Sequence, residues 1–290
     1  MSVAASRNSP KYGVIVIGAM KAATSTICAF LERNDAVYMA PGVEPNYFCW
    51  DANYAKGHKW YENLLAGRRH EAICAEGSNN YACCVLYPDT AARMAAYNPD
   101  MKIIYMVRNP LARIVSAWIQ NRADKGDDVP STLDAAVQQM PDIFVGQSRY
   151  WHNITQYREH FCDDQIFIGF TEDLYRDPDR FYTDLCAFLQ IAPPAPLQVG
   201  GAAHLNKSVG KRVPSQAYSA LKRLPLAGLF KALLPTSFKA LLRTRILTRK
   251  VIDRPVFSPD VRADLVKILG PDAAALLAHC RKPADFWSVG

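Results

Sequence analysis

The stretch VIVIGAMKAATSTICAFLE, residues 14–32, decides the fold because an apolar run, a break and an amphipathic segment follow one another in it. The β-branched run Val14–Ile17 is typical of a buried strand, and Gly18 ends it. Apolar residues recur at helical spacing over Thr24–Glu32, which predicts a helix. A strand, a loop and a helix in this order indicate the first unit of an α/β fold.

The same alternation continues along the chain. Further strands are predicted over Ala72–Glu76, Ile103–Val107 and Ile166–Phe170. The helices that follow them are predicted over Thr90–Tyr97, Leu111–Asn121 and Arg180–Leu189. Strands that alternate with helices form a parallel sheet with helices on both faces, so we expect an α/β fold.

Polar residues follow three of these strands, in the stretches Gly18–Ser25, Glu76–Tyr81 and Arg108–Pro110. In open parallel sheets, ligands bind outside the carboxyl ends of the strands. We therefore expect the functional site at the edge of the sheet where these three stretches meet.

The loop after the first strand is suited to a phosphate. Backbone N–H groups at a helix start hold anions, Lys21 adds a positive charge, and Thr24–Thr26 adds three hydroxyl groups. It is not a Walker A loop, in which a lysine directly precedes the Ser or Thr that holds magnesium. The alternative is an ordinary polar helix start with Thr24 or Ser25 as its N-cap.

Arg108 and Ser116 form a second candidate anion site. Ser116 follows Arg108 by two turns of the predicted helix, so both side chains can face the same crevice. A guanidinium and a hydroxyl together suit a second phosphate. The alternative is an arginine that pairs with a carboxylate and a serine packed within a helix.

Both elements, IVIGAMKAATST (15–26) and KIIYMVRNPLARIVSAW (102–118), resemble the elements with which sulfotransferases bind 3′-phosphoadenosine 5′-phosphosulfate (PAPS). The chain is most similar to the heparan-sulfate type and its bacterial relatives, rather than to the cytosolic phenol and steroid type. Further similar segments follow in the family's order: VEPNYFCWDANYAKGHKWYENLL (43–65), AEGSNNY (75–81), SRYWHNITQYREHF (148–161), IGFTEDLYRDP (168–178) and HLNKSVGKR (204–212).

The resemblance implies a P-loop-like parallel sheet flanked by helices, with a helical C-terminal cap. It implies one sulfotransferase domain over 1–290, with a nucleotide-binding core over 11–192 and a basic helical region over 193–290. The 5′-phosphosulfate would be held by Lys21, Ala22, Ala23, Thr24, Ser25 and Thr26. Arg108 and Ser116 would hold the 3′-phosphate, and Lys211 and Arg212 would close over the nucleotide.

Glu44 resembles the family's acidic residue before an aromatic pair, which is proposed to take the proton from the acceptor hydroxyl. A positioned carboxylate lowers the barrier for a poor nucleophile by general base catalysis. The expected reaction is a direct in-line transfer that yields 3′,5′-ADP, with Lys21 stabilising charge on the leaving nucleotide. No metal is expected. Without the resemblance, Glu44 would be interpreted as a surface glutamate before a turn proline.

Three positions depart from the family's pattern. Ala23 replaces a common glycine, and Asn46 stands where relatives often have histidine. Gly77 stands where relatives have a lysine that contacts donor or acceptor. A polyanionic chain is therefore not expected to bind in the relatives' way. Near the last of these positions, Glu76, Ser78 and Tyr81 are candidates for the acceptor side of the site.

The segment 222–250 carries eight Lys or Arg residues and no acidic residue. It is interpreted either as a helical cap with solvated cations or as a surface for peripheral membrane contact or an acidic acceptor. The chain is expected to end in two helices and Trp287. The net charge of +7 suits an anionic ligand. The eight irregularly spaced cysteines are expected to be reduced, without a zinc site.

The sequence therefore predicts a PAPS-dependent sulfotransferase that acts on a hydroxyl or amine of a small-molecule, carbohydrate or lipid-like acceptor. The start of the sequence lacks an apolar signal segment, so a cytoplasmic location is expected, and no nucleic-acid partner is expected. The alternatives are a P-loop kinase or NTPase, or a nucleotide-binding protein without catalysis. A kinase would need a Lys-Ser/Thr pair and an acidic magnesium ligand, and neither is in place.

Overall fold

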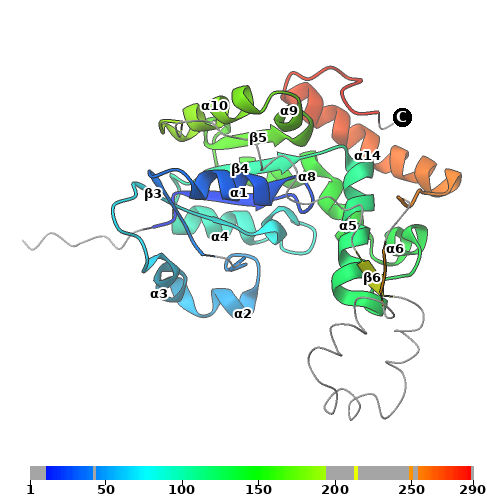
Figure 1. Ribbon diagram of the computed structural model, residues 1–290, viewed down its shortest axis with the longest axis horizontal. Helices are drawn as coiled ribbons and strands as arrows, with labels where there is room; N and C mark the ends of the chain where they lie inside the picture. Colours follow the sequence, from blue (N-terminus) through cyan, green and yellow to red (C-terminus); the bar gives the residue numbers. More distant parts are fainter. Residues whose placement is uncertain (1–10, 42–43, 194–211, 215–247, 251–253, 289–290) are drawn as a thin grey trace, which may run out of the picture.

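The computed structural model describes residues 11–41, 44–193, 212–214, 248–250 and 254–288, with the backbone alone for 212–214 and 248–250. The expected α/β fold is confirmed: a five-stranded parallel sheet has the order β2-β3-β1-β4-β5 (Figure 1). The strands are β1 (Val14–Gly18), β2 (Val37–Met39), β3 (Ile73–Gly77), β4 (Lys102–Val107) and β5 (Ile166–Phe170). A second, antiparallel pair joins β6 (Arg212–Pro214) to β7 (Thr248–Lys250).

β1 lies at the centre of the sheet because it is apolar on both faces. All five of its residues are buried, which suits a strand covered by helices on two sides. It pairs with β3, with Val16 opposite Gly77, and with β4, with Gly18 opposite Tyr105. β2 and β3 lie on one side of β1, and β4 and β5, which follow them in the chain, lie on the other side. The strand order therefore reverses between β1 and β4. Ligands bind at such a switch point.

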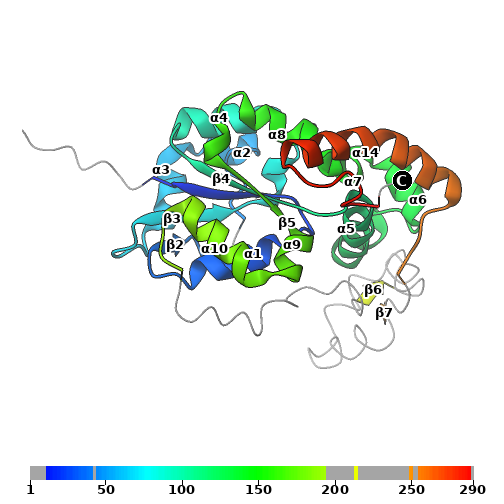
Figure 2. The same cartoon turned by 90° about the horizontal axis from the view of Figure 1, so that it is seen from above.

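Helices cover both faces of this sheet. Figure 2 shows α1, α9 and α10 on one face and α4 and α8 on the other. The α-helices of the described residues are α1 (Thr24–Glu32), α2 (Asp51–Tyr54), α3 (Gly57–Glu62), α4 (Thr90–Tyr97), α5 (Pro110–Lys125), α6 (Leu133–Gln139), α7 (Pro141–Phe144), α8 (Tyr150–Arg158), α9 (Thr171–Arg176), α10 (Pro178–Leu189) and α14 (Pro259–His279). Short 3₁₀ helices are η1 (Asn63–Leu65), η2 (Asn79–Ala82), η3 (Gly126–Asp128), η4 (Gly146–Ser148) and η5 (Asp163–Gln165).

The C-terminal helix corrects one expectation. The described part of the C-terminal region contains one long helix, α14, where two helices were expected, and it runs through Pro271. A proline inside a helix removes one hydrogen bond and favours a kink. Here Leu265, Leu269 and Leu276 remain buried on the core, and α14 packs against α8. The buried contacts on both sides of the proline hold the two halves together as one helix.

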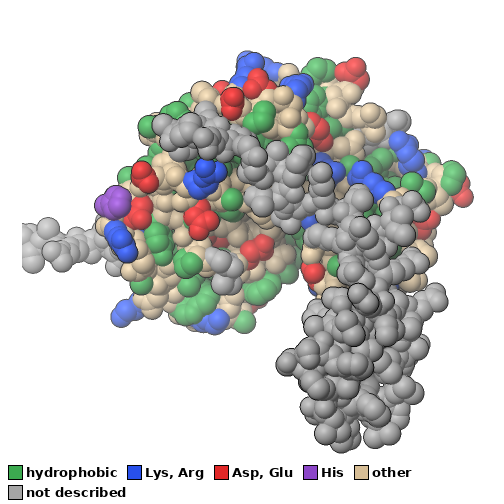
Figure 3. Space-filling model, viewed as in Figure 1, with side chains coloured by type: hydrophobic (Ala, Val, Ile, Leu, Met, Phe, Trp, Pro, Cys, Tyr) green, Lys and Arg blue, Asp and Glu red, His purple; other side chains and the backbone are tan. Residues whose placement is uncertain are grey.

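The described surface carries charged side chains of both signs. Figure 3 shows acidic and basic side chains interspersed on one face of the described part of the molecule. Most of the basic segment 222–250 lies outside the described residues, so its two interpretations stay predictions, as does the division of the chain at 192. Among the described helices, none is long and apolar enough to cross a membrane.

Candidate active site

A cavity of about 610 Å³ opens at the carboxyl ends of β1 and β4. Its size lies in the range of small-molecule sites, which is about 300–1,000 Å³. It brings together most of the residues that were singled out in the sequence. Those that line it are Lys21, Ala23, Thr24, Ser25, Thr26, Glu44, Arg108 and Ser116. We refer to it as the larger cavity.

The loop between β1 and α1 has an unusual backbone. Lys21 and Ala23 have φ angles of 72° and 65°, in the left-handed region that residues other than glycine rarely adopt. Ala23 is the N-cap of α1, so this conformation aims the start of the helix at the larger cavity. The left-handed form costs roughly 1–2 kcal/mol for a residue with a Cβ. This backbone explains why glycine suits the position.

Arg108 and Ser116 reach the larger cavity from the next strand and helix. Arg108 follows the last residue of β4, and its Nη1 donates to the carbonyl of Lys21 at 3.4 Å. Ser116 is 3% exposed on α5 and lines the same cavity. The Nζ of Lys21 donates to Gln120 Oε1 at 3.3 Å, also from α5. The two predicted anion sites thus share one cavity.

Arg113, which no sequence pattern singled out, lies under this loop. Its side chain is fully buried on α5. Its Nη1 donates to the carbonyl of Met20 at 3.5 Å, and its Nη2 donates to the carbonyl of Phe144 at 2.5 Å. Its Nε donates to Ser148 Oγ at 2.6 Å, and burial lowers the pKa of the guanidinium. An arginine among apolar helix positions was the signal that could have revealed this support.

Glu44 extends over the cavity from the loop after β2. Its carboxylate accepts from the backbone N–H of Asn79 at 3.1 Å, and the side-chain amide of Asn79 donates to its other oxygen. Asn79 begins η2, two residues after the last residue of β3. The carboxylate is therefore oriented by a neighbouring strand end, which the spacing of the two residues in the sequence did not reveal.

The backbone beside Glu44 is fixed by buried side chains. The N–H of Asn46 donates to Ser78 Oγ at 3.1 Å, and the N–H of Tyr47 donates to the hydroxyl of Tyr81 at 2.8 Å. Asn46 has a φ of 48°, in the left-handed region where Asn and His are both enriched. Its amide donates to the carbonyl of Glu44 at 3.0 Å. The substitution of histidine by asparagine therefore suits the turn.

Glu76, Ser78 and Tyr81 are placed differently from the expectation that they line the acceptor side. All three are at most 1% exposed and lie beneath the cavity, because they extend into the core at the end of β3. Glu76 accepts from the hydroxyl of Tyr61 at 2.9 Å and from Ser78 Oγ at 2.8 Å. Burial raises the pKa of Glu76 to about 7, against these hydrogen bonds. Their observed contacts support the loop that carries Glu44.

Three predicted residues remain: Ala22, Lys211 and Arg212. Ala22 is fully buried, and its N–H donates to the carbonyl of Ala19 at 3.0 Å. Lys211 lies outside the described residues, and only the backbone of Arg212 is described. Their expected contacts with the nucleotide stay predictions. Among the described residues, no group of three His, Cys, Asp or Glu side chains is arranged to hold a metal ion.

The geometry combines an anion site with a carboxylate. Lys21, Arg108 and the start of α1 supply positive charge and donors at one side of the larger cavity. Glu44 supplies a proton acceptor at another side. This arrangement suits the binding of a phosphorylated nucleotide and the removal of a proton from a second molecule.

The sulfotransferase domain family matches this chain over residues 14–224, so the chain belongs to that family. It is 33% identical over 171 residues to heparan sulfate glucosamine 3-O-sulfotransferase 3A1 of Mus musculus, a match that covers 57% of this chain and 42% of that protein. It is 25% identical over 192 residues to the bifunctional heparan sulfate N-deacetylase/N-sulfotransferase 1 of Caenorhabditis elegans, with 61% and 22% covered. The chain thus spans less than half the length of these curated relatives.

Two solved structures share the fold. A sulfotransferase from Alicyclobacillus acidocaldarius superposes with a TM-score of 0.63 at 20% identity, over 94% of this chain and 97% of that one. Mouse sulfotransferase SULT7A1, complexed with PAP, superposes with a TM-score of 0.51 at 16% identity, over 91% and 85%. The family predicted from the two sequence elements is confirmed.

Proposed function

We propose that this protein transfers a sulfuryl group from PAPS to a hydroxyl group of an acceptor. One observation carries the proposal. The larger cavity collects the loop after β1, Arg108, Ser116 and the carboxylate of Glu44, although these residues lie far apart in the sequence. A donor with two phosphate positions needs two anion sites, and an acceptor hydroxyl needs a base beside them. The relatives named above support the same reaction class.

The proposed reaction is one in-line displacement at sulfur. The acceptor oxygen forms a bond to sulfur while the bond from sulfur to the bridging oxygen of the 5′-phosphate breaks. The proton of the acceptor goes to Glu44, and the electron pair of the broken bond stays on the leaving 3′,5′-ADP. Lys21 stabilises the charge that develops there, and the hydroxyl groups of Thr24–Thr26 bind the phosphosulfate.

Arg108 and Ser116 are assigned to the 3′-phosphate. They line the larger cavity from the end of β4 and from α5, whereas the loop of Lys21 approaches from β1. A guanidinium binds a phosphate through charge-assisted hydrogen bonds, and a hydroxyl adds a further donor. The preference for a 3′-phosphorylated nucleotide therefore depends on a part of the cavity separate from the 5′ site.

Calorimetric titration without magnesium tests the donor site directly. We expect micromolar binding of 3′,5′-ADP and much weaker binding of ATP and AMP. Turnover of PAPS with a sulfated product, again without magnesium, distinguishes an enzyme from a protein that only binds the nucleotide. Equal affinity for the three nucleotides would contradict the proposal and favour the kinase or binding-protein alternative.

A further inference from the structure

A second, smaller cavity of about 300 Å³ adjoins the larger one. It lies between α1 and the carboxyl ends of β2 and β3, and its volume is at the lower end of small-molecule sites. The two cavities share Thr24, Ser25, Glu44 and Asn79 in their walls. The proposed base therefore stands where they meet.

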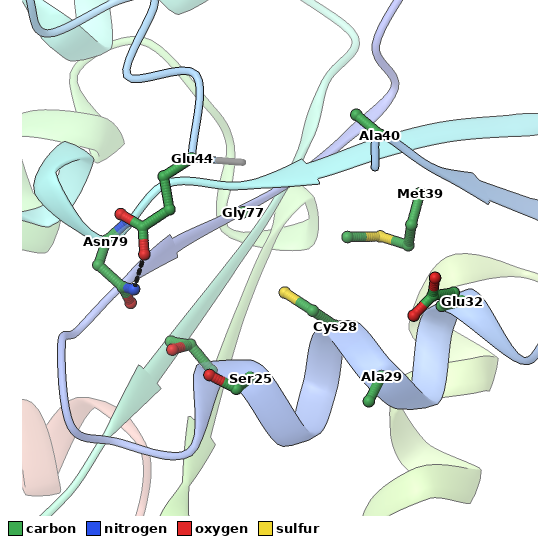
Figure 4. A pocket seen from close by; sticks show the side chains of 10 residues that line it. Ser25, Cys28, Ala29, Glu32, Met39, Ala40, Glu44, Gly77 and Asn79 are labelled. Carbon is green, nitrogen blue, oxygen red and sulfur yellow. Dashed lines mark hydrogen bonds between the residues drawn. The ribbon is translucent and has the colours of Figure 1, made fainter. Parts of the chain in front are cut away.

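This junction indicates what the smaller cavity is for. In the transfer proposed above, the acceptor oxygen must lie between Glu44 and the sulfuryl group, so the rest of the acceptor must extend away from the nucleotide. Figure 4 shows Cys28 and Met39 pointing into the smaller cavity, with Glu44 and Asn79 at one end and Glu32 at the other. The smaller cavity is therefore positioned to hold the part of the acceptor that extends away from the nucleotide.

The lining of the smaller cavity sets the chemistry of its ligand. Cys28, Ala29, Met39 and Ala40 make its apolar wall. Burial and nearby carboxylates raise the pKa of the Cys28 thiol to about 12, so the thiol is neutral at physiological pH. The charged residues of the lining are Glu32 and Glu44, and among the described residues that line it none is a lysine or arginine. An anionic group inside it would face the like charge of Glu32 and Glu44, with no cationic partner among the described lining residues.

Gly77 keeps the smaller cavity open beside the base. A Cβ atom built at this glycine would lie 2.7 Å from Cys28 Sγ, closer than real Cβ contacts. The glycine therefore allows α1 and β3 to approach, and position 77 adds no side chain to the cavity. The space beside Glu44 is left for a ligand.

We propose that the smaller cavity binds the acceptor and selects a compact alcohol with an apolar body and no negative charge. This inference rests on the proposed function, since it assigns the second substrate of the same site. Among the described residues, the positively charged side chains Lys21, Arg108 and Lys125 line the larger cavity and not the smaller one, so donor and acceptor are separated by charge. A sulfated glycan, which carries many negative charges, would find no cationic partner among the described residues of this wall.

Three alcohols that differ in one substituent test the selection. Benzyl alcohol, 4-(aminomethyl)benzyl alcohol and 4-(hydroxymethyl)benzoate are neutral, cationic and anionic, and a sulfated heparan oligosaccharide serves as the polyanion. We expect sulfate transfer from PAPS to the first two, with kcat/KM for the benzoate at least about tenfold lower. Equal rates for the three alcohols, or a preference for the benzoate or the oligosaccharide, would overturn the inference.

A blocking substitution tests the location. Ala29 lines the smaller cavity but not the larger one. Ala29→Phe should therefore fill the smaller cavity and reduce kcat/KM for benzyl alcohol about 10- to 100-fold. The affinity for 3′,5′-ADP should stay unchanged, which also shows that the variant is folded. Ala135→Phe is the matched control, because Ala135 is a half-buried helical alanine outside both cavities. Full activity of Ala29→Phe would overturn the assignment.

A charge reversal tests the electrostatic part. Glu32→Lys should shift the ratio of kcat/KM for the benzoate over that for the aminomethyl alcohol about tenfold in favour of the benzoate. Asp35→Lys makes the same change in net charge at an exposed residue outside the cavity and should leave the ratio unchanged. An unchanged ratio in Glu32→Lys would remove Glu32 from the site.

The binding of 3′,5′-ADP distinguishes a failure of the proposed function from a failure of the acceptor inference. If 3′,5′-ADP does not bind in preference to ATP and AMP, the proposed function fails and the acceptor assays lose their basis. If 3′,5′-ADP binds but neither benzyl alcohol nor its aminomethyl derivative binds the nucleotide-loaded protein or is sulfated, the proposed function stands and the acceptor inference is wrong.

Discussion

Two loops meet where the cavities join, and they are held in place by different means. The loop after β1 contains left-handed residues that are not glycine, and two arginines from the next strand and helix donate to its carbonyls. The loop of Glu44 is held by neutral hydroxyl groups of Ser78 and Tyr81, which a buried carboxylate orients in turn. In both cases the neighbouring strand end fixes the loop, so the sheet sets the position of donor and base together.

The largest expected effect separates the chemistry of the second loop from its structure. Glu44→Gln keeps the size of the side chain but removes the proton acceptor, so turnover should fall at least about 100-fold. The affinity for 3′,5′-ADP should hardly change, since Glu44 is not assigned to the nucleotide. Steady-state kinetics and calorimetry measure the two effects. Glu159→Gln makes the same change at an exposed glutamate outside both cavities and should leave turnover unchanged, whereas near wild-type turnover in Glu44→Gln would refute Glu44 as the base.

The next effect concerns the first loop and its arginine. Arg108→Ala should weaken the binding of 3′,5′-ADP about 10- to 100-fold, the scale of lost charged hydrogen bonds. The binding of adenosine 5′-phosphosulfate, which lacks the 3′-phosphate, should weaken far less. Lys125→Ala removes another positive charge from the same cavity and should affect both ligands alike. An equal loss for both ligands in Arg108→Ala would remove Arg108 from the 3′-phosphate site.

A pH-dependent effect tests the support of the Glu44 loop. The pKa of Glu76 is raised from 4.5 to about 7, so between these values the folded state holds a proton that the unfolded state releases. The free energy of unfolding should therefore fall as pH rises through this window and level off above it. Glu76→Gln cannot titrate, so its unfolding in urea should lack this component. The same pH dependence in both proteins would show that the pKa of Glu76 is not raised in the folded state.

The smallest effect tests the backbone of the first loop. Ala23→Gly removes the Cβ from a left-handed residue, and part of that gain is offset by a more flexible unfolded chain. We expect a gain in stability of up to about 1 kcal/mol, measured by urea denaturation. Ala22→Gly, next to it but outside the left-handed region, should lose about 1 kcal/mol. A loss of stability in Ala23→Gly would mean that the loop is not strained there.

Local patterns predicted the frame of the molecule well. Thr24–Glu32 and Ile166–Phe170 were predicted with the observed ends, because the change between polar and apolar residues is sharp at both. β2 was missed because a strand of three residues at the edge of a sheet carries too little alternation. The one long helix α14 stands where two helices were expected, and it continues through Pro271 because buried contacts distant in the sequence hold its two halves together.

The candidate site was predicted in part for the same reason. Residue types at strand ends indicated Lys21 and Arg108, the family resemblance indicated Glu44, and the structure places all three around one cavity. The bond between Glu44 and Asn79 spans 35 positions, and the inward direction of Glu76 depends on the pleat of β3. Neither is a property of a short stretch of sequence. The smaller cavity depends on the approach of α1 to Gly77, which also needed the folded chain.

The placement of β1 between β3 and β4 has a consequence for how the site comes into being during folding. Lys21 contacts Gln120 across 99 positions and Arg108 across 87, so both contacts close very long loops. Closing long loops is entropically unfavourable, and folds with such non-local pairing form slowly. A chain that has not yet added β4 beside β1 has not assembled the proposed nucleotide site. Binding of 3′,5′-ADP during refolding would therefore report completion of the central sheet, later than signals from helix formation.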